Sequence, residues 1–142
     1  ESRIVRLGTK IATVMLMAGA WDAIAKVETS LGRLADQHEM QILIDRTEFP
    51  NSATGYLPYA IEIVDAQNID TMHAIVSFLS QRRAIIADLS CHSYKTSRTE
   101  TQMMQLQITV DLPADTSIAT VRGEFMDLCD QLNLDALMEP AK

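Results

Sequence analysis

Apolar and polar residues alternate strictly over residues 104–112, and this is the clearest pattern in the chain. The apolar positions are Met104, Leu106, Ile108, Val110 and Leu112. Successive side chains of a β-strand point to opposite faces, so the alternation predicts a strand with one buried and one polar face. Shorter apolar runs predict further strands over 2–7, 10–18, 40–45, 59–64, 85–94 and 134–138.

Three other stretches place apolar residues three or four positions apart, the spacing of one helix face. The first of them carries Trp21, Ile24, Val27, Leu31 and Leu34. Helices are therefore predicted over about 21–37, 70–83 and 117–132.

The order of these elements contains an internal repeat. Residues 1–48 read strand, strand, helix, strand, and residues 58–142 read strand, helix, strand, strand, helix, strand. Met40 and Leu134 open equivalent last strands, and residues 49–57 form a Pro-, Ser- and Gly-containing linker. The second copy is a complete ferredoxin-like βαββαβ unit of the α+β class, with an antiparallel sheet and both helices on one face.

The first copy lacks the opening strand and helix of this pattern. A three-stranded sheet with one helix would leave a sheet face uncovered and an edge open. We therefore expect about thirty further residues before Glu1, or another chain, to cover that surface.

The charge excludes some classes of partner. Twelve basic residues are scattered among nineteen acidic ones, and the net charge is −7. Nucleic-acid binding needs clustered Lys and Arg, so neither direct nucleic-acid binding nor attachment to an anionic membrane is expected. Cys91 and Cys129 form no CxxC pair and no secretory leader is present, which predicts reduced thiols in a cytoplasmic protein.

The side chains that could carry chemistry are few. No nucleophile lies in a recognisable motif, the three histidines have no metal-ligand spacing, and no glycine-rich phosphate loop is present. Asp65 and Asp70 flank one strand-to-helix loop and are the best candidates for an acid–base pair. A helix cap and a solvated turn explain them equally well, so no catalytic residue, metal or cofactor is predicted.

Several segments together resemble the glycine cleavage system transcriptional repressors, a bacterial family built of two tandem ACT domains. The segments are ESRI at 1–4, VMLMAGAWDAI at 14–24, IADLS at 86–90, LQIT at 106–109 and EFMDLC at 124–129. The resemblance implies a non-catalytic repressor that contacts a DNA-binding transcriptional activator in response to glycine. It also implies a tandem of ACT domains whose first copy is truncated at its N-terminus.

ACT domains bind small ligands, usually amino acids, beside the loop after the first strand. In the complete copy this loop maps to Gln67, Asn68, Ile69 and Asp70. These residues lack the family's glycine, which is expected to weaken amino-acid binding there.

Ser2 and Arg3 are the candidates to line a site in the partial copy. The Arg3 guanidinium can pair with a ligand carboxylate, and an ordinary exposed strand arginine explains it as well.

Two alternatives remain open. The chain could be an amino-acid-sensing domain pair of a metabolic enzyme, or a small ferredoxin-like enzyme, although no catalytic set supports the latter. A homodimer is also predicted, because open sheet edges pair readily. The strand over 104–112 and the apolar run 14–17 are its candidate contacts.

Overall fold

The computed structural model describes residues 1–48, 55–65, 69–97 and 99–141. The chain divides into two compact units, Glu1–Phe49 and Pro50–Lys142, which we describe separately. Within the described residues, no helix is long and apolar enough to cross a membrane.

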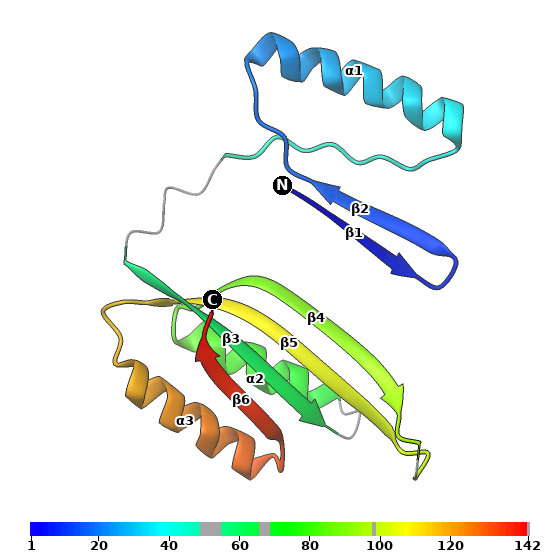
Figure 1. The fold of residues 1–142 in the computed structure, drawn as a ribbon. Helices are drawn as coiled ribbons and strands as arrows, with labels where there is room; N and C mark the ends of the chain where they lie inside the picture. The colour runs from blue at the N-terminus through cyan, green and yellow to red at the C-terminus, as the bar shows by residue number, and fades with distance from the viewer. Residues whose placement is uncertain (49–54, 66–68, 98, 142) are drawn as a thin grey trace. The chain divides into compact units, whose positions relative to one another are not determined.

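The second unit is a four-stranded antiparallel sheet with two helices on one face (Figure 1). Its strands follow the order β4-β5-β3-β6. The elements are β3 (Tyr56–Asp65), α2 (Ile69–Gln81), β4 (Ile85–Lys95), β5 (Gln102–Pro113), α3 (Ile118–Gln131) and β6 (Asp135–Pro140). This is the βαββαβ order predicted for the second copy, and the α+β ferredoxin-like class is confirmed.

The alternation over 104–112 is confirmed as the core-facing row of β5. All five apolar side chains of this row are buried. Ile61 and Ile63 of β3 are buried on the same face, because β3 pairs with β5 in register. The helices close the core with Ile75 and Leu79 from α2 and with Val121, Phe125 and Cys129 from α3.

Arginines tie the end of α2 to the rest of the helical layer. The Arg82 guanidinium lies 3.5 Å from the centre of the Phe78 ring and donates to the Phe78 carbonyl. It also donates to the Glu124 carboxylate of α3 at 2.6 Å. Arg83 donates to both oxygens of Asp115, at 3.0 and 3.1 Å. These contacts join the C-terminus of α2 to α3 and to the turn that precedes α3. Positive charge is favourable at a helix C-terminus.

The register corrects the contact predicted for a homodimer. β5 pairs along its length with β3 on one side and β4 on the other. A strand with two partners has no free backbone groups to offer a second copy, so residues 104–112 are not an open edge. The edges of this sheet are β4 and β6.

The first unit contains the hairpin β1 (Ser2–Leu7) and β2 (Lys10–Met15), followed by α1 (Trp21–His38). Gly8 turns the hairpin with φ +62°, a conformation that costs glycine little. None of the residues 1–48 is buried. Of the apolar stripe predicted for α1, Trp21, Val27 and Leu34 are exposed within the described chain, with Trp21 73% accessible, and Ile24 and Leu31 are half-buried.

Residues 40–45, predicted as a strand, pair with no strand in the described structure. The second unit supplies the physical reason. There the equivalent strand β6 pairs only with β3, the opening strand of the copy. Residues 1–48 contain no counterpart of β3, so 40–45 has no neighbour with which to form a ladder. Part of the predicted linker, 49–54, lies outside the described residues, and β3 begins at Tyr56.

The core of the second unit can be tested at Phe125, whose ring is fully buried with its centre 5.8 Å from that of Phe78. Phe125→Ala should lower the free energy of unfolding by about 3–5 kcal/mol, because it leaves a cavity. Urea unfolding followed by far-UV circular dichroism measures the loss. The neighbouring Met126→Ala, on the exposed side of α3, is the control. A loss below about 1 kcal/mol for Phe125→Ala would contradict this packing.

Candidate functional site

The junction between β3 and α2 is the loop in which a ligand was expected. Gln67 and Asn68 lie outside the described residues, and Ile69 and Asp70 open α2. Asp65, the last residue of β3, accepts a hydrogen bond of 2.6 Å from the Thr71 hydroxyl. Thr71 is only 3% exposed, so this bond joins the strand end to the first turn of the helix under partial burial.

This contact gives Asp65 a structural role. Its carboxylate is held by the helix that it precedes, whereas Asp70 is exposed in the first turn of α2. Negative charge is favourable at a helix N-terminus, and two carboxylates here already provide it. They would repel the carboxylate of an incoming amino acid. The geometry thus favours weak amino-acid binding at this loop, and the ligand-binding role of residues 67–70 stays a prediction.

The other two candidates, Ser2 and Arg3, lie on β1 in the first unit. Ser2 is opposite Met15 and Arg3 opposite Val14 in the hairpin register. The Arg3 guanidinium is 3.5 Å from the Glu1 carboxylate, and both side chains are more than half exposed. An exposed ion pair of this kind contributes little stability.

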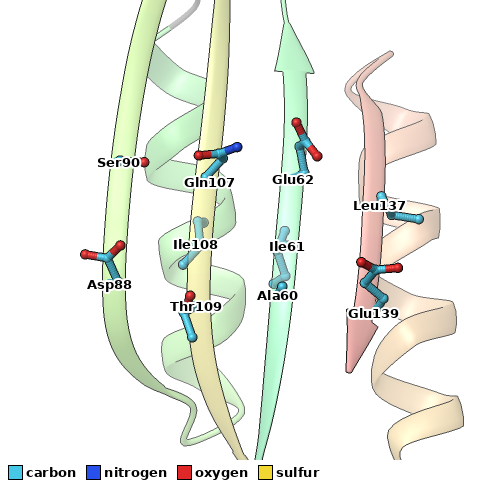
Figure 2. A pocket seen from close by; sticks show the side chains of 10 residues that line it. All are labelled: Ala60, Ile61, Glu62, Asp88, Ser90, Gln107, Ile108, Thr109, Leu137 and Glu139. Carbon is cyan, nitrogen blue, oxygen red and sulfur yellow. The ribbon is translucent and has the colours of Figure 1, made fainter. Parts of the chain in front are cut away.

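A second candidate surface was not found from the sequence. The sheet face opposite the helices carries a shallow hollow of about 250 Å³, shown in Figure 2. Glu62 of β3, Asp88 of β4 and Glu139 of β6 line it, with Gln107 and Thr109 from the central strand β5. The polar residues that alternate with the buried row over 104–112 indicated that β5 has a polar face. The sequence could not show which residues of β3, β4 and β6 lie beside Gln107 and Thr109 on that face, because this depends on the register.

The chemistry of this hollow is that of hydrogen-bond acceptors and negative charge. The Gln105 amide donates to the Glu62 carboxylate. In the described parts of the chain, no group of three or more His, Cys, Asp or Glu side chains is placed to hold a metal ion.

The cysteine thiols are the strongest intrinsic nucleophiles among the described side chains. Cys129 is fully buried in α3, and this burial, with the nearby Asp130 charge, raises the pKa of its thiol to about 11. Cys91 is exposed on β4. A buried thiol with a raised pKa is inert at neutral pH, so Cys129 serves as a core residue.

With this geometry established, comparison with known proteins shows what the chain is similar to. It is 26% identical over 137 residues to the glycine cleavage system transcriptional repressor of Escherichia coli (strain K12). The match covers 94% of this chain and 70% of that protein. The protein of the same name from Shigella flexneri matches to the same extent. No family model matches the chain.

Two solved structures share the fold across the whole chain. One is described, provisionally, as a glycine cleavage system transcriptional repressor, with 22% identity and a TM-score of 0.73 over 80% of that chain. The other is described as an unknown protein from Galdieria sulphuraria, with 15% identity and a TM-score of 0.72 over 81% of that chain. The resemblance drawn from the sequence is thus confirmed, and the named relatives are transcriptional regulators.

The junction can be tested by removing the hydroxyl that holds Asp65. Thr71→Val keeps the shape of the side chain but leaves a partly buried carboxylate without this donor. The free energy of unfolding should fall by about 1–3 kcal/mol, as measured by urea denaturation. Thr71→Ser retains the hydroxyl and should recover most of the loss. Equal stability of the valine and serine variants would remove the structural role assigned to this bond.

The two cysteines should differ sharply in reactivity. At pH 8 a thiol with a pKa of about 11 is ionised in roughly one molecule in a thousand, and Cys129 is also buried. Iodoacetamide should therefore label the folded chain at Cys91 alone, as read by intact mass. Cys91→Ser should abolish labelling until urea is added. Rapid labelling of Cys129 in the folded protein would show that α3 is not packed as described.

Proposed function

We propose that this chain is a non-catalytic regulatory protein of amino-acid metabolism that acts on transcription by binding a DNA-binding activator. One observation carries the proposal: similarity to named transcriptional regulators runs along 94% of the chain. The net charge of −7 agrees with it, because a regulator this acidic is suited to a protein partner rather than to DNA.

A small amino acid, glycine being the first candidate, is proposed as the effector. The relatives are named for the glycine cleavage system. Ser2 and Arg3 are the preferred contacts, since the Arg3 guanidinium is accessible and can pair with a carboxylate. Ile69 and Asp70, with 67–68, are the weaker candidates because of the acidic junction around them.

The remaining parts of the proposal concern the setting of the protein. A cytoplasmic location fits a regulator of transcription. It also fits the two cysteines, Cys91 and Cys129, which form no disulfide with each other. Self-association as a homodimer stays a prediction, with the open edges β4 and β6 as the surfaces available in the second unit. The tandem ACT organisation with a partial first domain at 1–48 and a complete one at 58–142 belongs to the same proposal.

The test is recovery of the partner. The affinity-tagged chain is expressed in the cells of its source, and co-purified proteins are identified by mass spectrometry with and without added glycine. A DNA-binding transcription factor should be recovered in an amount that changes with glycine and does not change with leucine, the control effector. Arg3→Ala should abolish the response to glycine without abolishing recovery.

Three outcomes would contradict the proposal. Recovery of a metabolic enzyme in place of a transcription factor would favour the alternative of an enzyme's regulatory domain pair. Recovery of no partner would remove the support for regulation by contact. Binding of the purified chain to DNA alone, with a steep dependence on salt, would show that the activator is not needed.

A further inference from the structure

Residues 40–48 follow α1 and form neither a helix nor a ladder with a described strand. The helix ends at Glu39, whose left-handed conformation, with φ +52°, lets the chain reverse its direction. The Met40 amide then donates to the Ala35 carbonyl at 3.1 Å, which ties the start of the segment to the end of α1. From there the segment runs back along the helix (Figure 1).

An ion pair ties the other end of this segment to the same helix. Arg46 donates from Nε to one carboxylate oxygen of Glu28 and from Nη2 to the other, both at 2.9 Å. Two parallel hydrogen bonds fix the orientation of the guanidinium as well as its distance, which a single contact does not. The hydrogen bonding and charge of Arg46 also lower the pKa of the Glu28 carboxyl, so the pair is charged at neutral pH.

Glu28 belongs to the partly covered face of α1. The half-buried residues of the helix recur at the spacing of one face, and they are Ile24, Ala25, Glu28, Leu31 and Ala35. In the segment, Met40, Ile42 and Ile44 are 43%, 37% and 42% exposed, whereas Leu43 is 89% exposed. One side of the segment is therefore less exposed than the other, and the ion pair joins the segment to the covered side of the helix.

The second unit has no counterpart of this ion pair. The repeat that makes Met40 equivalent to Leu134 places Arg122 and Pro140 at the positions of Glu28 and Arg46. An arginine and a proline cannot form such a pair. In that unit the last strand, β6, is held by its ladder with β3. The first unit thus has an ion pair at the place where the second has backbone pairing.

We infer that Glu28 and Arg46 form a latch that holds residues 40–48 along α1 and fixes where the chain leaves the first unit. No backbone hydrogen bond joins 41–46 to other described residues, so side chains must hold this stretch. Surface ion pairs contribute little on average, but a two-point arginine–carboxylate contact is one of the exceptions. Without it, the last tie to α1 would be at Met40. The inference does not depend on the proposed function.

Backbone order parameters from ¹⁵N NMR relaxation of the whole chain test the latch, because they report on each amide separately. Glu28→Gln removes the charge and keeps the size of the side chain. Arg46→Lys keeps the charge but cannot make the two-point contact. Glu28→Arg with Arg46→Glu reverses the pair. Asp22→Asn is the matched control, since Asp22 also carries a negative charge on α1 but pairs with Lys26 of the same helix.

In the native chain at low salt, amides 41–46 should have order parameters of about 0.8, close to those of rigid backbone. In Glu28→Gln they should fall below about 0.6, with Arg46→Lys between the two. The reversed pair should restore most of the order, and Asp22→Asn should leave it unchanged. The order of α1 itself verifies that each variant keeps the helix. If Glu28→Gln loses the helix, about 1 M NaCl replaces the variant, because screening at that concentration should release the pair in the native chain.

Three results would overturn the latch. The first is equal order of 41–46 in the native chain and in Glu28→Gln. The second is a reversed pair that fails to restore order while α1 stays folded, since an ion pair does not depend on which partner carries which charge. The third is order parameters below about 0.6 in the native chain itself, which would show that the segment is not held. Each of them leaves the regulatory function standing, because recovery of the partner tests that function separately.

Discussion

The pairing of β3 at the centre of its sheet is the constraint on which the second unit depends. β3 is the only strand that joins β5 to β6, and it places Ile61 and Ile63 beside the apolar row of β5. Its last residue, Asp65, accepts a hydrogen bond from the Thr71 hydroxyl, which joins the end of β3 to the first turn of α2. The start of α2 therefore depends on β3, which is one of the two interior strands of the sheet, β5 being the other.

The first unit shows what the same pattern becomes when that strand has no counterpart among the described residues. Its two strands form a hairpin, its helix buries no residue, and 40–45 forms no ladder. A strand is defined by its partners rather than by its own composition, since backbone groups need a neighbouring chain to pair with. The apolar residues at 40, 42, 43 and 44 match the pattern of a strand, but no neighbouring strand is present to pair with them in the described structure.

This difference shows how far the sequence can be interpreted alone. Period-two and helical patterns are local, so the alternation at 104–112 predicted its strand and its buried face, and the helical stretches predicted their helices. The buried face of α2 was not predicted, because Ile75, Phe78 and Leu79 form it. The register is not local, because it depends on which strands meet. The sequence therefore could not show that Glu62, Asp88 and Glu139 would surround one hollow, or that the strand at 104–112 would be interior. Asp65 and Asp70 were placed correctly beside a helix start, but only the structure showed that the Thr71 hydroxyl donates to Asp65.

The same alternation has a consequence for how such a domain can evolve a partner. Glu62 lies between Ile61 and Ile63, two of the most buried residues in the chain, yet its own side chain is exposed on the opposite face. Changes on the uncovered row leave the packed row untouched, since successive side chains never share a face. A sheet with helices on one side only can thus acquire charge for recognition without losing core stability. A sheet covered on both faces has no such row, and a regulator built on it would have to bind partners through loops or edges.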